Sequence, residues 1–173
     1  MDALAGRRSV SARRDQGLAA AAWEMVVGLP RPLRQEFRSQ AMGLGPMLVT
    51  SGLAATAAFL AAKAGPAEGA GHAGGGDQAA ATDGAPAADG AGTTLAGAYR
   101  ALADALAAHV LGRLGLPGGD CTALVRELGK PEFDAAAYRR ASADARAFGI
   151  WARRAAEALI PPPRANAGPG DGP

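Results

Sequence analysis

Apolar residues recur at steps of three and four along most of this chain, a spacing that places them on one face of an α-helix. The first such segment covers residues 8–28, and Gly28 with the prolines after it ends the helix. Its apolar face consists of Leu18, Ala22, Met25 and Leu29. The clearest segment covers residues 134–160, where Asp134 is placed to cap the helix. Its apolar stripe consists of Tyr138, Ala141, Ala145, Phe148, Ala152, Ala155 and Leu159.

Residues 39–62 contain no charged side chain, although Arg38 precedes them and Lys63 follows. A helix of this length could cross a bilayer, because an α-helix rises about 1.5 Å per residue. A buried helix at the centre of a bundle would also exclude charge. The steps of three and four favour the buried helix, as does the small share of large apolar residues. The positions at which an introduced charge is expected to unfold the bundle are Leu48, Leu53 and Phe59.

Gly43, Gly45 and Pro46 interrupt this uncharged stretch. Proline lacks a backbone donor and clashes with the preceding turn of a helix. The sequence therefore predicts two helices, 33–43 and 46–63, with a kink or break between them.

A third helix is predicted over about 94–113, with Thr93 or Thr94 as its N-cap. The residues expected to point inward are Leu95, Tyr99, Leu102, Leu106 and Val110. After a turn rich in glycine, Asp120 is placed to cap a short helix over 121–128.

Residues 64–92 are mainly Gly, Ala, Asp and Pro, without any Leu, Ile, Val or aromatic residue. Such a segment cannot bury enough apolar surface to offset its ordering entropy, so a long disordered linker is predicted. It contains the letters G-x-G-x-x-G at Gly69, Gly71 and Gly74, but no strand precedes them, and dinucleotide binding is excluded. The predicted organisation is N-terminal helices in 1–63, the linker, C-terminal helices of the same bundle in 93–160, and a disordered tail in 161–173.

Alanine dominates the hydrophobic half of the composition, and strand-forming residues are scarce, which predicts an all-α fold of five or six helices in one bundle. The net charge is +2, but the linker carries four acidic residues and no basic one, which leaves +6 on the rest. A modestly basic body is compatible with a polyanionic partner. Arg139, Arg146 and Arg153 recur every seven residues on one helix, with Arg140 and Arg154 beside them. They could form a solvated face with i,i+4 ion pairs, Arg140–Asp144 and Arg153–Glu157, or bind a polyanion.

Catalytic and metal-binding patterns are missing from the sequence. Cys121 is the single cysteine, and of the two histidines His72 stands in the predicted linker while His109 stands beside an apolar helix face. We therefore expect no enzyme activity, no cofactor, no metal site and no small-molecule substrate. The arginines near the N-terminus have no apolar segment behind them, so no secretory signal is indicated and a cytoplasmic location is expected.

Two segments resemble a known family. The first runs from Phe37–Arg38–Ser39 through Pro46–Met47–Leu48–Val49 and Gly52–Leu53 to Ala58–Phe59–Leu60 and Lys63. The second contains Tyr138–Arg139–Arg140–Ala141–Ser142, Trp151–Ala152–Arg153–Arg154 and Glu157–Ala158–Leu159, and Ala98–Tyr99 also matches. In order and spacing they are similar to the small helical subunit of type III-B CRISPR effector complexes, the Cmr small subunit of the RAMP module.

The resemblance implies a non-catalytic, all-α subunit of an antiviral ribonucleoprotein. Members stack in several copies along the groove of guide RNA and target RNA, beside backbone subunits that cleave the target, in a complex that also has a large subunit. The positions that the resemblance assigns to RNA contacts are Arg38, Lys63, Arg139, Arg140, Arg153 and Arg154. Arg146 extends the same face, where the family pattern usually has an aliphatic residue.

The sequence leaves two other functions open. Residues 39–62 could anchor a single-span membrane protein, which would place the chain at a membrane. A small helical DNA-binding regulator would need a helix-turn-helix, and the Pro and Gly breaks between residues 28 and 46 do not clearly give that geometry.

Overall fold

The computed structural model describes residues 2–65 and 89–163, and within these ranges the chain is all-α, as the sequence predicts. Its helices, in chain order, are α1 (Asp2–Val27), the 3-10 turn η1 (Arg31–Leu33), α2 (Arg34–Thr50), α3 (Gly52–Ala64), α4 (Asp89–Leu114), α5 (Cys121–Leu128) and α6 (Ala135–Leu159). The central part of the predicted linker lies outside the described residues. Its two ends are helical, because Ala64 closes α3 and Asp89 opens α4.

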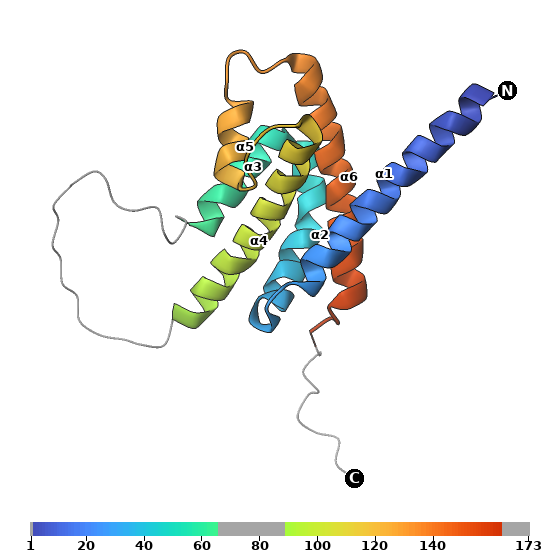
Figure 1. Cartoon of the computed structure of the whole chain (residues 1–173). Helices are drawn as coiled ribbons and strands as arrows, with labels where there is room; N and C mark the ends of the chain where they lie inside the picture. The colour runs from blue at the N-terminus through green and yellow to red at the C-terminus, as the bar shows by residue number, and fades with distance from the viewer. Residues whose placement is uncertain (1, 66–88, 164–173) are drawn as a thin grey trace, which may run out of the picture.

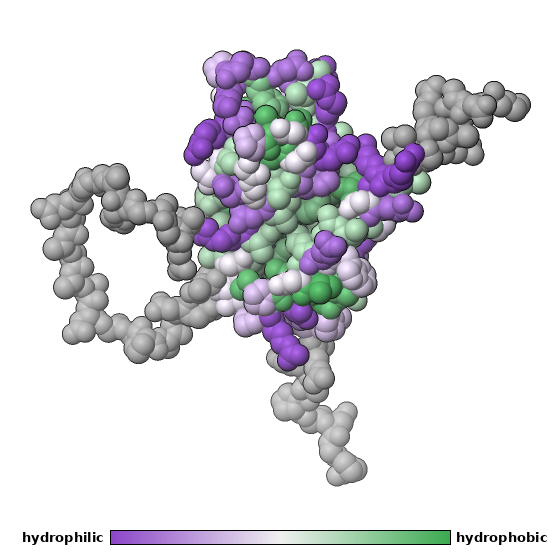
Figure 2. Space-filling model, in the orientation of Figure 1, coloured by the Kyte–Doolittle hydropathy of each residue, from purple (hydrophilic) through white to green (hydrophobic). Residues whose placement is uncertain are grey.

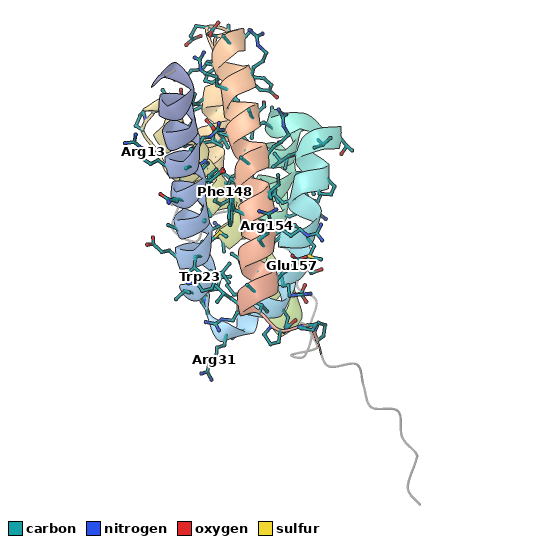
Figure 3. The ribbon with its side chains drawn as sticks, turned by 90° about the vertical axis from the view of Figure 1, so that its right-hand side faces the viewer. Arg13, Trp23, Arg31, Phe148, Arg154 and Glu157 are labelled. Atoms are coloured by element: carbon teal, nitrogen blue, oxygen red, sulfur yellow. The ribbon has the colours of Figure 1, made fainter. Side chains whose placement is uncertain are left out.

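Helix α6 lies at the centre of one side of the bundle, between α1 and α2 (Figures 1 and 3). Helix α4 packs behind these helices, against α2, α3 and α6, and α5 packs against α3 and α4. The apolar faces of these helices meet in one core. The largest side chains that are fully buried in it are Phe37, Phe148, Leu44, Leu48, Leu53, Leu60, Leu102, Leu106, Leu111, Leu124, Ile160 and Val26.

The uncharged stretch breaks at Ser51–Gly52, so the break predicted between Gly43 and Pro46 is wrong. Helix α2 continues through Pro46 for another turn. Gly52 has φ +78°, in the left-handed region that favours glycine, and this residue turns the chain into α3. The hydroxyl of Tyr138 in α6 accepts a hydrogen bond of 3.3 Å from the Ala54 N–H, which satisfies one free donor at the start of α3.

Helix α2 tolerates Pro46 because packing against α6 offsets the missing backbone hydrogen bond. A Cβ at Gly149 of α6 would lie 3.6 Å from both the Cα and the N of Gly45, so the two helices meet closely at these glycines. Gly45 therefore serves helix packing, whereas the sequence pattern indicated that it interrupts the helix.

Only one side of residues 39–62 is buried. Leu48 and Leu53 are buried as expected, but Phe59 is 38% exposed, so the expectation that it lies in the core is wrong. Phe59 follows Leu53 by six residues, which places it on another face of α3. The continuous helix that the membrane-anchor interpretation requires is not formed. No helix in the described part of the chain is long and apolar enough to span a membrane.

Helix α4 differs from the prediction at its start. It begins at Asp89, so Thr93 and Thr94 lie inside the helix and are not its N-cap. Leu95, which was expected to point inward, is 37% exposed, whereas Leu102, Leu106 and Val110 are fully buried. In α1 the buried face contains Val26, and Met25 is only partly buried.

The short helix and the last helix follow the sequence pattern closely. The Asp120 carboxylate accepts a hydrogen bond from the Ala123 N–H at 2.9 Å and caps α5. The Asp134 carboxylate accepts one from the Ala137 N–H at 2.9 Å and caps α6. Both N-cap predictions are confirmed.

Candidate nucleic-acid interface

A groove of about 620 Å³ separates the outer edges of α2 and α6. Its floor contains Gly45, Pro46 and Gly149, where the two helices meet. Its walls are formed by Val49, Arg146, Ile150, Arg153, Arg154 and Glu157. The groove therefore combines an apolar base with three guanidinium groups and one carboxylate.

The arginines of this groove come from successive turns of α6. Arg146 and Arg153 are seven residues apart and Arg154 follows directly, so a helix brings all three to one edge. Arg153 Nε donates to Glu157 Oε1 at 2.9 Å, which confirms this predicted i,i+4 pair. The Arg154 guanidinium lies 5.2 Å from the centroid of the Trp151 ring. Figure 3 shows Arg154 and Glu157 on the outer side of α6, and Phe148 pointing into the bundle.

Arg139 and Arg140 lie near the N-terminal end of the same helix, and both are exposed. They extend the basic edge beyond the groove without lining it. Their charges lie close to the N-cap: hydrogen bonds from the Ala137 and Ala136 N–H groups lower the pKa of Asp134, and the two arginines lower it further.

Arg38 and Lys63 lie away from this edge. Arg38 lines a separate hollow of about 460 Å³ beside Met42 and Pro163. Its Nε atom is buried with no hydrogen-bond partner in the described ranges. Lys63 is exposed in the last turn of α3, and its Nζ lies 5.8 Å from the centroid of the Phe59 ring. The structure thus brings Arg146, Arg153 and Arg154 together and leaves these two apart.

Asp144 is the residue whose role sequence reasoning missed. Its carboxylate is almost buried, and it forms an ion pair with Arg14 of α1 and a longer one, 3.8 Å, with Arg113 Nε of α4. The predicted Arg140–Asp144 pair is therefore wrong as a local pair, because Asp144 turns toward α1 and α4. The only indication in the sequence was that this acidic residue stands next to the apolar stripe of its helix. That position does not identify ion-pair partners that are distant in sequence.

His109 and Cys121 have no chemical role in this interface. The His109 ring stacks on Phe148, with centroids 5.1 Å apart, and burial lowers its pKa. Cys121 Sγ donates to the Ala57 carbonyl at 3.1 Å, and burial raises the pKa of its thiol to about 11. A thiol with so high a pKa is a poor nucleophile at neutral pH.

Residues 14–159 match the family model described as CRISPR-associated protein (Cas_Cmr5). No curated protein and no solved structure matches the chain. The matched range runs from the middle of α1 to the end of α6, so it contains the groove and its arginines. Because the match covers most of the sequence, the chain belongs to the Cas_Cmr5 family, the small subunit of type III-B CRISPR complexes.

Proposed function

We propose that this protein is a non-catalytic structural subunit that stacks in several copies along the guide RNA–target RNA groove and contacts the target RNA through its α2–α6 groove. Family membership supports assembly with the backbone and large subunits of the Cmr complex. The observation that carries the RNA contact is the convergence of Arg146, Arg153 and Arg154 on one open groove. The complex would act in the cytoplasm as part of antiviral defence.

The chemistry of this groove suits a nucleic-acid backbone. Guanidinium groups form bidentate hydrogen bonds with phosphates and neutralise them, and they need not read the sequence. Three arginines and one glutamate give the walls a formal charge of +2. Pro46, Val49 and Ile150 offer apolar surface to ribose and base faces. Sequence specificity would then come from base pairing between guide and target.

A charge-deletion experiment tests this assignment. The triple variant Arg146→Gln, Arg153→Gln and Arg154→Gln removes the basic wall and retains helix-forming residues. In the assembled complex it should weaken retention of target RNA. Each lost phosphate contact should also lower the slope of log affinity against log salt by about 0.7.

The matched control removes the same number of positive charges elsewhere. Arg31, Arg126 and Lys130 are exposed and line none of the hollows described above, so their replacement by Gln should leave RNA retention unchanged. If the triple variant of the groove arginines (the groove triple) retains target RNA as well as this control variant does, the α2–α6 groove does not bind the target.

The exposed apolar residues of α3 and α4 support self-association. Phe59 meets Tyr99 edge to face, with ring centroids 6.0 Å apart, and Leu95 lies one turn before Tyr99 on α4. Figure 2 shows a pale, weakly apolar band over α4 between more hydrophilic regions. We propose this α3–α4 surface as the contact between stacked copies.

The double variant Phe59→Ser and Leu95→Ser tests the stacking contact, because neither side chain is in the core. It should reduce the number of small subunits per complex, measured by native mass spectrometry, without loss of helicity. Val27→Ser is the control, since Val27 is 56% exposed on α1. An unchanged copy number in the double variant would exclude this surface.

A further inference from the structure

A second basic hollow, of about 260 Å³, lies between α1 and the C-terminal part of α4. Its walls are formed by Arg13, Arg14, Gly17, Leu18, His109 and Arg113. Figure 2 shows hydrophilic side chains gathered at this junction of α1 and α4. None of these residues is among those that the family resemblance assigns to RNA contacts.

The buried carboxylate of Asp144 anchors this hollow from below. It holds Arg14 in an ion pair, and Arg113 Nε lies 3.8 Å from Asp144 Oδ2. That distance is too long for a hydrogen bond, so charge holds the Arg113 guanidinium near the carboxylate while its donors can serve another acceptor. The side chains of Arg14 and Arg113 are 42% and 54% exposed, so both can reach a ligand from solution.

Neutralising Asp144 does not account for the whole cluster. One arginine is enough to balance one carboxylate, whereas Arg14 and Arg113 together leave a formal charge of +1 on this group of three side chains. His109 adds a buried Nε2 atom that has no hydrogen-bond partner among the described residues. The hollow has room for a phosphate group, because its volume is about nine times the ~30 Å³ that a water molecule occupies in the liquid.

We infer that this α1–α4 hollow binds a phosphodiester group of RNA, with Arg14 and Arg113 as its principal donors. The inference rests on the proposed function, and it adds a contact point on the opposite side of α6 from the α2–α6 groove. Asp144 acts as a positioning residue that holds the two guanidinium groups at the opening. The RNA strand would thus meet the subunit at two basic sites.

His109 reports on occupancy of the hollow. Three charged side chains act on the His109 ring: Asp144 of α6, Arg14 of α1 and Arg113 of α4. The ring also stacks on Phe148. Burial and the two arginines favour the neutral imidazole, whereas Asp144 favours the charged form. A phosphodiester anion in the hollow would favour the charged form further, so binding should raise the pKa of His109.

The first experiment measures this rise by NMR with the dinucleotide UpU as the probe and uridine, which has no phosphate, as its control. The His72→Gln background leaves one imidazole signal in the chain. UpU should raise the pKa of His109 in a saturable manner, and uridine should not. Arg113→Gln should weaken the response to UpU about tenfold, because it removes a charge-assisted hydrogen bond. Arg126→Gln, an exposed change on α5, should leave the response unchanged.

The second experiment asks whether the hollow meets RNA in the assembled complex. Arg113→Gln should lower target-RNA affinity and reduce the salt slope by about 0.7 for each lost contact. A UpU response equal to that of uridine, or RNA affinity unaffected by Arg113→Gln, would overturn the inference. If only the groove triple weakens RNA binding, the inference fails and the proposed function stands. If only Arg113→Gln weakens it, the inference stands and the groove assignment fails.

Discussion

The packing of α2 on α6 depends on the absence of a side chain at Gly149. A Cβ built there would lie 3.3 Å from Leu48 Cδ1 and 3.6 Å from the backbone of Gly45. The first distance is tighter than an ordinary van der Waals contact, so alanine fits only if Leu48 shifts. A longer side chain would meet the backbone of α2 and separate the helices.

Gly43 provides a matched control, because it is also a glycine inside a helix but a Cβ there would meet nothing within 4 Å. Replacing a glycine in an exposed helix by alanine or leucine stabilises it by up to about 1 kcal/mol. Overpacking a buried site costs about 1–3 kcal/mol. We therefore expect Gly43→Leu to raise the free energy of unfolding and Gly149→Leu to lower it, with a difference between the two of about 3 kcal/mol.

Urea unfolding followed by far-UV circular dichroism measures this difference, provided that the slope of the transition is equal in the two variants. The free energy of unfolding of Gly149→Ala should lie between those of the two leucine variants, since the gain in helix propensity is offset by the contact with Leu48. A Gly149→Leu protein as stable as the wild type would contradict the close approach of α2 and α6.

Three further predictions concern buried polar groups. Burial raises the pKa of the Cys121 thiol from 9.0 to about 11, so at pH 8 iodoacetamide should modify the folded protein about a hundredfold more slowly than the unfolded chain; equal rates would contradict that burial. Burial lowers the pKa of His109, so the folded state binds fewer protons than the unfolded state, and stability should fall as the pH drops below 6.5. His109→Gln should remove this part of the pH dependence, and a variant whose urea midpoint falls as steeply as that of the wild type would refute it. Tyr138→Phe should lower the free energy of unfolding by about 1 kcal/mol, because Ala54 N–H loses its acceptor; Tyr99→Phe is the control, and equal losses would count against the cap.

The helices that carry their own boundary residues could be predicted from sequence. Asp120 and Asp134 cap α5 and α6 through their own side chains, so local sequence was sufficient to place both starts. The apolar stripe of α6 is amphipathic enough that its buried face, including Ala141, Ala145 and Phe148, follows from spacing alone.

The break in the uncharged stretch could not be located in the same way. The sequence alone does not show which of Gly43, Gly45 and Gly52 ends the helix, because these glycines differ only in their packing. Gly45 meets α6, whereas Gly52 adopts a positive φ. The Ala54 N–H that follows Gly52 donates to the hydroxyl of Tyr138, which is 84 residues away in sequence. A tertiary contact of this kind overrides the local tendency of Pro46 to end a helix.

The candidate site, too, could be predicted only where local sequence determines it. The seven-residue spacing of Arg146 and Arg153 predicted that they share an edge of α6, and the structure adds the α2 wall that turns this edge into a groove. The α1–α4 hollow could not be predicted in this way, because Arg14, Arg113 and Asp144 come from three helices and meet only in the folded chain.

The central claim is that the α2–α6 groove lies against target RNA in the assembled complex, and site-specific photocrosslinking tests it most directly. A photoreactive amino acid at Ile150, which is 51% exposed in the groove wall, is compared with one at the exposed Thr122 of α5. We predict a crosslink from position 150 to target RNA and none from position 122. Crosslinks from position 150 to protein subunits alone would contradict the claim.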